Sequence, residues 1–146
     1  GTVSTFITGG LTGLILGDSA LDINVHDTYF VVGHFHIVMG LSAIYGMYAG
    51  VYHWFPKMYG KMMNKNLGYL HFWGTFICAY GVFFPMHFLG LAGMPRRIPD
   101  FPDAYSGWNL IASFGSYISA ISAVLFFYIV YITLTSGKRV NSKTFW

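Results

Sequence analysis

The chain has 146 residues, of which 55% are hydrophobic and only 9% are charged, and its formal net charge is +3. A soluble domain usually carries about 25% charged residues, so this composition excludes an ordinary soluble domain and favours burial in a membrane. The few lysines are spread over separate loops, which argues against nucleic-acid binding. Lipid is therefore the expected surrounding of this protein.

Four apolar stretches predict membrane-spanning helices, at approximately residues 2–17, 29–55, 67–92 and 107–135. The first would reach only about 24 Å at the rise of an α-helix, which is short of the ~30 Å hydrocarbon core of a bilayer. The other three are long enough to cross, and Pro85 should kink the third. We therefore expect an all-α, polytopic transmembrane bundle of about three and a half spans, forming one segment of a membrane domain over residues 1–146.

The charged residues predict how the spans are oriented. One side holds six basic residues: Lys57, Lys61, Lys65, Lys138, Arg139 and Lys143. The other side holds Asp18, Asp22, Asp27, Arg96, Arg97, Asp100 and Asp103. The positive-inside rule places the lysine-rich side in the cytoplasm or the mitochondrial matrix, so the aspartate-bearing loops should face outward.

Two histidines lie deep in the second span, within LDINVHDTYFVVGHFHIVMG at residues 21–40. Positions i and i+2 of an α-helix differ by about 200°, so His34 and His36 should leave opposite sides and cannot chelate one metal. Each can serve a separate haem iron, which is commonly held by a single protein histidine, and Phe35 lies between them. The alternative is two helix-contact histidines, each with its own polar partner.

His26 and Asp27 are adjacent at the outer end of the same span. An imidazole beside a carboxylate can ligate a hard divalent ion such as Mg or Mn. Two ligands do not complete a site, so the remainder would come from water or another chain. The alternative is a solvated turn.

Arg96 and Arg97 lie on the same outer side, in GMPRRIPDFPDAY. Paired guanidinium groups suit carboxylates, including haem propionates. The alternatives are contacts with lipid headgroups or salt bridges to Asp100 and Asp103.

The other chemistry-bearing residues are interpreted as packing residues. His53, His71 and His87 are expected to be satisfied helix contacts, and Cys78 is expected to pack in a span. Small residues also recur at intervals that allow close helix approach, at Gly9, Gly13 and Gly17 and at Gly46 and Gly50.

The window HDTYFVVGHFHIVMG resembles the tenth transmembrane helix of subunit I of the haem-copper oxidases. LAGMPRR with PDFPDAY resembles the loop after that family's eleventh helix, and the similarity runs from GGLTGLIL through HWFP and FFPMHFLGLAGMPRR to the last span. The chain thus resembles the C-terminal part of this twelve-helix catalytic subunit. The His-Asp-Thr run favours the mitochondrial cytochrome c oxidase type over the quinol oxidases.

The resemblance implies a role for each matching residue. His34 would be the proximal ligand of haem a3, where dioxygen is reduced, and His36 would be an axial ligand of haem a, which donates electrons to it. Phe35 would lie between the haems. The resemblance further implies that His26 and Asp27 ligate Mg at the boundary with subunit II.

The same resemblance implies a binding region for the haem propionates. Arg96 and Arg97 would hold these carboxylates, and Asp22 would lie near those of haem a3 in the proton exit region. Ile98-Pro99 departs from the family's usual Tyr-Ser, which bears on a nearby sodium or calcium site and not on the haems.

The family's copper B ligands, its cross-linked tyrosine, the second haem a ligand and the proton-channel Glu and Lys lie upstream of the matching region. The chain is therefore not expected to be a complete catalyst alone. The resemblance implies a respiratory-chain oxidase that reduces dioxygen to water and pumps protons. Its expected partners are the N-terminal portion of subunit I, subunit II and other oxidase subunits, with cytochrome c as electron donor. The expected location is the mitochondrial inner membrane, ahead of a bacterial plasma membrane.

The residues leave further hypotheses open. The chain could be a separately encoded piece of a split subunit, which we favour, or a fragment of a longer one, and one continuous polypeptide across Gly1 would rule out the split. It could also be a dihaem electron-transfer protein without oxygen chemistry. Finally, it could be a non-catalytic helical module that packs against an oxidase.

Overall fold

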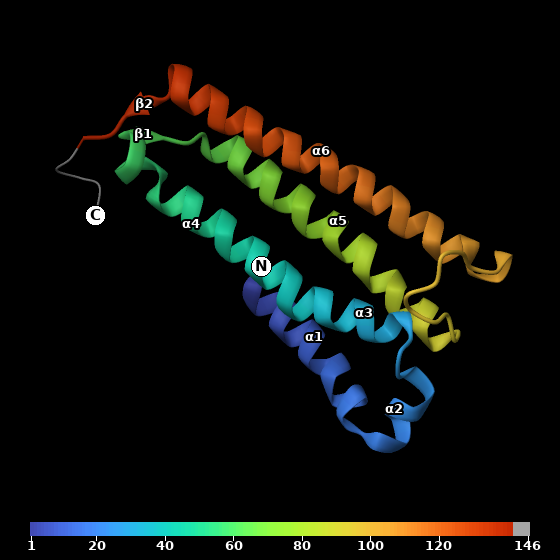
Figure 1. The fold of residues 1–146 in the computed structure, drawn as a ribbon. Helices are drawn as coiled ribbons and strands as arrows, with labels where there is room; N and C mark the ends of the chain where they lie inside the picture. The colour runs from blue at the N-terminus through green and yellow to red at the C-terminus, as the bar shows by residue number, and fades with distance from the viewer. Residues whose placement is uncertain (142–146) are drawn as a thin grey trace.

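A computed structural model describes residues 1–141 of the chain. Its long helices lie side by side along one direction, and two short strands meet at one end (Figure 1). Within the described residues, three helices are long and apolar enough to cross a membrane, and a bent pair near the N-terminus makes up to four. The predicted all-α, polytopic transmembrane bundle is thereby confirmed.

The first predicted span is helix α1, Thr2–Gly17, which is followed directly by the short helix α2, Ser19–Val25. The two helices are bent by 102° relative to each other. Asp18 lies at the bend in an extended conformation, and its side chain accepts a hydrogen bond of 3.0 Å from the Ala20 backbone N–H. The polar break expected after residue 17 is thus a helix, because Asp18 satisfies an N–H of its first turn.

The second predicted span has three parts: α3, Tyr29–Phe35, the π-helical segment η1, His36–Leu41, and α4, Ser42–Tyr59. Thr28 caps α3, since its hydroxyl accepts a hydrogen bond from the Phe30 N–H. A π-helix takes one more residue per hydrogen-bonded turn than an α-helix and often occurs at functional sites. Regular α-helical geometry therefore does not continue through both histidines, because α3 ends at Phe35 and the π-helical segment begins at His36.

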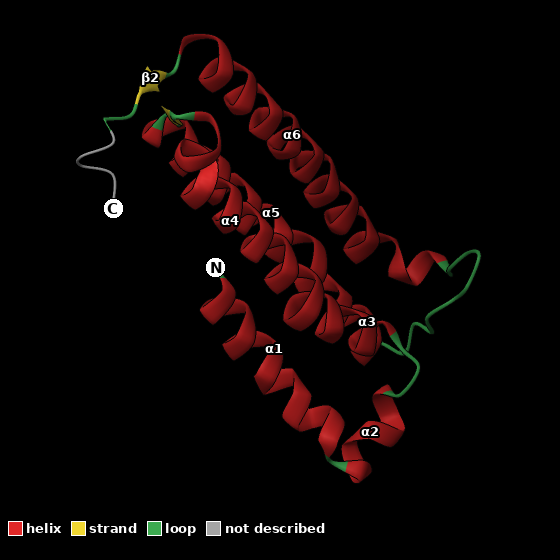
Figure 2. Cartoon of the chain, turned by 60° about the vertical axis from the view of Figure 1, so that its left-hand side comes forward, coloured by secondary structure: helices red, strands yellow, loops and turns green. Residues whose placement is uncertain are grey.

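The remaining spans are α5, Lys65–Leu91, and α6, Ser106–Ser136, which follows the short 3-10 helix η2, Asp103–Tyr105. Asn64 caps α5 by accepting from two backbone N–H groups. Pro85 lies inside α5, and the helix continues through it without a break. Figures 1 and 2 place α6 beside α5 and α1 beside the α3–α4 helix, so α3, α4 and α5 form the middle of the bundle.

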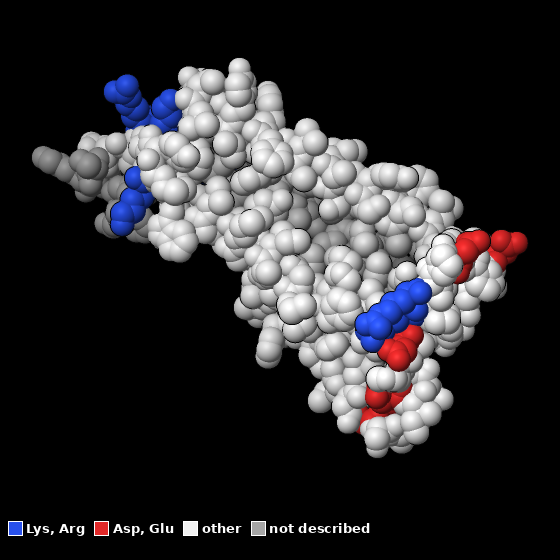
Figure 3. Space-filling view, in the orientation of Figure 1, with Lys and Arg blue, Asp and Glu red and all other residues white. Residues whose placement is uncertain are grey.

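The two ends of the bundle differ in charge. At one end, β1, Lys61–Met62, pairs antiparallel with β2, Lys138–Arg139. Figure 3 shows basic side chains at this end and acidic side chains at the opposite end, beside a second basic group. The helices thus separate the two sets of charged loops as predicted, although Lys143 lies outside the described residues. Which side each end faces in a membrane stays a prediction.

Glycines set how closely the helices approach. A Cβ placed on Gly90 of α5 would overlap the Phe30 backbone, and one on Gly9 of α1 would overlap the Val38 side chain. Helices in membranes associate through small residues at such contacts. These approaches bring α1 and α5 against the part of the second span that carries the two intramembrane histidines.

Candidate functional site

His34 lies on α3 and turns its ring toward α1. Its Nδ1 is 2.9 Å from the Gly9 carbonyl oxygen and 3.0 Å from the Thr12 hydroxyl. A Cβ on Gly13 would come within 3.1 Å of the imidazole Cε1, so a larger residue there would press against the ring. Three residues of α1 thereby fix the orientation of this histidine.

His36 lies at the start of the π-helical segment and contacts a different helix. Its Nδ1 is 2.8 Å from the Val32 carbonyl oxygen, one turn earlier in the chain. Its ring stacks on Phe83 of α5, with centroids 4.9 Å apart and an interplanar angle of 9°, and also on Phe35, at 4.5 Å. The two imidazoles therefore lie against α1 and α5 respectively.

The hydrogen bonds of both rings decide which nitrogen can bind a metal. A carbonyl oxygen only accepts, so Nδ1 of each ring must carry the proton, and Nε2 then holds the lone pair. Histidines that ligate metals usually donate their other ring N–H to a carbonyl or carboxylate. The donor chemistry of His34 and His36 thus fits one iron at each Nε2.

Two other intramembrane histidines are buried helix contacts, as expected, but each has one unpaired nitrogen. His71 Nδ1 is 3.0 Å from the Tyr52 hydroxyl, and His87 Nδ1 is 3.1 Å from the Phe83 carbonyl oxygen. Nε2 of both rings is buried with no hydrogen-bond partner among the described residues. The expectation that they are satisfied is therefore met for only one nitrogen of each.

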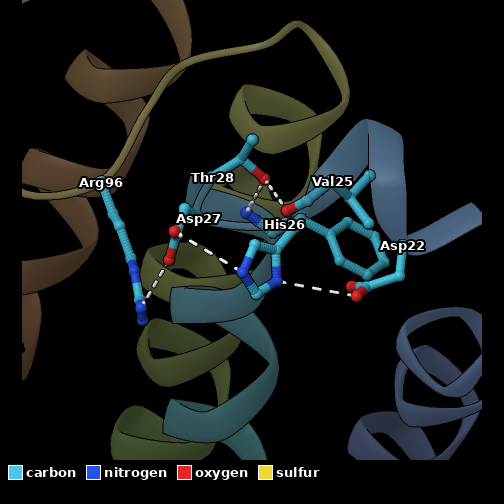
Figure 4. A network of polar contacts seen from close by, with 7 residues as sticks. Asp22, Val25, His26, Asp27, Thr28 and Arg96 are labelled. Carbon is cyan, nitrogen blue, oxygen red and sulfur yellow. Dashed lines mark hydrogen bonds and ion pairs between the residues drawn. The ribbon is translucent and has the colours of Figure 1, made fainter. Parts of the chain in front are cut away.

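At the acidic end, four side chains form a row (Figure 4). Asp22 Oδ2 is 3.6 Å from His26 Nδ1, and His26 Nε2 is 3.6 Å from Asp27 Oδ2. The row ends at Arg96, whose Nη2 is 2.6 Å from Asp27 Oδ1. Of the alternatives open for Arg96, an ion pair is found, but it goes to Asp27 and not to Asp100 or Asp103.

Backbone contacts join this row to the loop after α5. The Arg96 N–H donates to the Asp27 carbonyl at 3.0 Å, and the Tyr29 N–H donates to the Met94 carbonyl at 3.1 Å. Asp27 and Arg97 both have left-handed backbones, with φ of 55° and 61°. This conformation costs most L-residues about 1–2 kcal/mol, and such residues cluster at functional sites. The loop contacts hold the Asp27 side chain at its place in the row.

His26 and Asp27 can offer a cation two adjacent ligands. Their side chains are 67% and 60% exposed, and Nε2 and Oδ2 lie 3.6 Å apart. Within residues 1–141, no three His, Cys, Asp or Glu side chains converge closely enough to hold a metal. The pair therefore fits a hard divalent ion only if water or another chain completes the site.

Several residues of these sites carry no signal in the sequence. Thr12 and Val32 are bonded to the intramembrane histidines, and Phe83 stacks on one of them. A threonine or phenylalanine in an apolar run carries no mark of such a contact. Gly9 was indicated only by its helix-packing interval.

Comparisons with known proteins show which family this chain resembles in sequence. The family model described as cytochrome c and quinol oxidase polypeptide I matches residues 1–118. Cytochrome c oxidase subunit 1 of Yarrowia lipolytica is 50% identical over 143 residues, which is 98% of this chain and 27% of that protein. The subunit 1 of Eremothecium gossypii is 50% identical over 141 residues, which is 95% of this chain and 26% of that protein.

A solved structure shows the same fold. The chain is similar to a chain of a heme-copper terminal oxidase dimer with a TM-score of 0.81 at 23% identity, covering 99% of this chain and 27% of that one. The resemblance to subunit I of the haem-copper oxidases is thus confirmed by the sequence matches, and the shared fold agrees with it. Since the family model matches most of its length, the chain belongs to the family of cytochrome c and quinol oxidase polypeptide I.

Proposed function

We propose that this chain forms part of the catalytic subunit of a cytochrome c oxidase and supplies axial ligands to two haems. His34 would hold haem a3 and His36 would hold haem a. The observation that carries this proposal is the arrangement of the two rings. Each directs Nδ1 at a backbone carbonyl, which leaves Nε2 for iron, and they lie against different helices.

The surrounding residues orient these ligands. Thr12 and the Gly9 carbonyl restrain His34, so that its Nε2 keeps one direction. The stack of Phe35, His36 and Phe83 restrains the second ring. Bound haem iron would supply electron transfer and the reduction of dioxygen to water; the copper B ligands would come from the N-terminal portion of subunit I.

The haem propionates and a magnesium ion would bind at the acidic end of the bundle, which carries Asp22, Asp27 and Arg96. Arg96 and Arg97 would bind the haem propionates, with Asp22 nearby, and His26 and Asp27 would ligate Mg at the boundary with subunit II. Electrons would arrive from cytochrome c through subunit II. Protons would enter from the lysine-bearing end, and some would leave at the acidic end, coupling the reaction to pumping across the mitochondrial inner membrane.

Reduced-minus-oxidised spectra of the purified complex test this proposal. We expect haem a bands and a haem that binds carbon monoxide. In His36→Ala, the haem a contribution should be lost while carbon monoxide still binds after chemical reduction. His53→Ala removes an imidazole from the same span, near its basic end, and should leave the spectrum unchanged.

Two results would favour the other hypotheses. A native complex with two haems but no carbon monoxide binding would indicate a dihaem electron-transfer protein. Both haems persisting unchanged in His34→Ala and in His36→Ala would indicate a helical module that binds no haem.

A further inference from the structure

The basic end of the bundle carries positive charge that no acidic side chain of the chain balances. Its described basic residues are Lys57, Lys61, Lys65, Lys138 and Arg139, whereas all five acidic side chains lie at the opposite end (Figure 3). Lys65 and Lys138 make no ion pair or hydrogen bond with another side chain of residues 1–141. Uncompensated charge of one sign attracts anions from outside the chain.

The two short strands place like charges opposite each other. Lys61 pairs with Arg139, and Met62 pairs with Lys138, in an antiparallel register. Like charges directly opposite in such a pair destabilise it. Lys61 is compensated in part, because its amine donates a hydrogen bond to the Leu134 carbonyl near the end of α6. The strand pair thus gathers cations without an acidic partner, and a bound anion would stabilise it.

A pocket of about 480 Å³ lies beside these strands, between the start of α5 and the end of α6. Successive residues of a strand point to opposite faces, so Lys138 lies on the face opposite to Arg139, where it lines the pocket. Lys65 lines it from the first turn of α5. The other polar lining residues are uncharged amides and hydroxyls: Asn64, Asn66, Thr133 and Ser136. The pocket therefore offers two cations and several hydrogen-bonding groups, and its described lining contains no acid.

The helix ends around the pocket also favour an anion. The N-terminus of α5, a helix of 27 residues, lies at the pocket and carries the positive end of the helix dipole. The negative end of α6 opposes this effect, but the Lys61 amine already neutralises part of it at the Leu134 carbonyl. Met62, Met63 and Ile132 add apolar surface to the lining. This combination suits a ligand with both an anionic and an apolar part.

We propose that this pocket binds the phosphate-bearing headgroup of an anionic phospholipid, and that Lys65 and Lys138 contact its phosphate oxygens. Three candidate spans begin or end beside the pocket, so it lies at the level of the bilayer headgroups (Figure 1). Basic pockets between membrane-spanning helices bind such headgroups. Free phosphate has the same charge chemistry but no apolar part to contact the methionines. The inference goes beyond the proposed function, because it involves no haem ligand.

Photo-cross-linking in the purified complex tests the site. A phosphatidylglycerol that carries a diazirine beside its phosphate is incorporated with the complex into nanodiscs, and the cross-linked peptides are identified by mass spectrometry. We expect cross-links to the two lining segments, at residues 62–66 and 132–138. Excess phosphatidylglycerol should displace the probe from these peptides, whereas phosphatidylcholine, which has no net charge, should displace it much less.

Two lysine variants and a matched control test which charges bind the headgroup. Lys65→Gln and Lys138→Gln should each weaken the apparent affinity of the probe about fivefold, which corresponds to about 1 kcal/mol per basic residue at a membrane surface. Lys57→Gln removes the same charge at the same end from a residue that does not line the pocket, and should leave the affinity close to native. A normal haem spectrum shows that each variant has assembled.

The outcomes separate this inference from the proposed function. No cross-link to either segment, in a native complex with a normal haem spectrum, would overturn the lipid site and leave the haem assignments standing. Equal weakening by Lys57→Gln and Lys65→Gln would also overturn it, because the effect would then come from net charge. Displacement of the probe by inorganic phosphate as effectively as by phosphatidylglycerol would show that the pocket binds free phosphate and not a lipid.

Discussion

Replacing His34 with alanine should abolish carbon monoxide binding and dioxygen reduction by the assembled complex. In the proposed arrangement, the His34 Nε2 is the protein's bond to the haem where these ligands bind. Alanine has no nitrogen to bind iron, and the Thr12 hydroxyl, which contacts His34 Nδ1, also donates to the Gly9 carbonyl and so offers no replacement ligand. The measurement is the carbon monoxide difference spectrum of the reduced complex, together with its rate of oxygen consumption.

Thr12→Val removes a residue that orients His34 and leaves the histidine itself in place. Thr12→Val removes the hydroxyl that lies 3.0 Å from His34 Nδ1 but leaves the Gly9 carbonyl in place. Loss of such a supporting partner typically costs about 10- to 100-fold in metal affinity or activity, so carbon monoxide should still bind, with a shifted spectrum. Normal carbon monoxide binding and a normal spectrum in His34→Ala would eliminate the haem a3 assignment.

Gly90→Ala should destabilise the complex, although alanine normally favours a helix. Gly90 is the second-last residue of α5, where alanine would stabilise the helix by at most about 1 kcal/mol relative to glycine, the difference found in helix interiors. At this position its Cβ would overlap the Phe30 backbone nitrogen, which cannot rotate away as a side chain could. Overpacking of this kind costs about 1–3 kcal/mol, and contact with backbone favours the upper end. The thermal midpoint of the complex, followed by circular dichroism, should fall.

Gly81→Ala is the matched control on the same helix. A Cβ at Gly81 meets no atom within 4 Å, so only the gain in helix propensity remains. Its thermal midpoint should be equal to or above that of the native complex. Equal stability of Gly90→Ala and Gly81→Ala would show that α5 does not approach α3 as closely as the structure indicates.

The membrane class and the long helices could be predicted from local properties. Apolar runs of sufficient length predict spans wherever they occur, and α1 ends at Gly17 and α5 crosses the bundle as the runs indicate. Helix α2 was missed because Asp18 acts through a cap and not through an apolar run. The π-helical segment from His36 was missed as well, because its residues are ordinary helix formers in composition.

The sequence likewise predicts one part of the histidine site and not the other. That His34 and His36 face different neighbours follows from their spacing, since the two positions point in different directions along any helix. Which helices they meet does not follow from it. Thr12 lies 22 residues from His34, and contacts of that kind depend on how α1 packs.

The acidic end depends most on tertiary structure. The sequence places Asp27 and Arg96 on one side of the membrane, because an even number of crossings separates them, but it does not pair them. Their 2.6 Å contact and the left-handed backbone of Asp27 exist only because the loop after α5 is hydrogen-bonded to the start of α3.

The sequence by itself thus determined a helical membrane protein, two imidazoles in one span and charges gathered at its two ends. These features depend on composition and on intervals of a few residues, which the chain carries wherever it folds. Only the tertiary structure decided which carbonyl holds each imidazole and which partner holds Arg96. Those choices depend on glycines that let helices approach to backbone contact, and that geometry arises only when distant segments pack together.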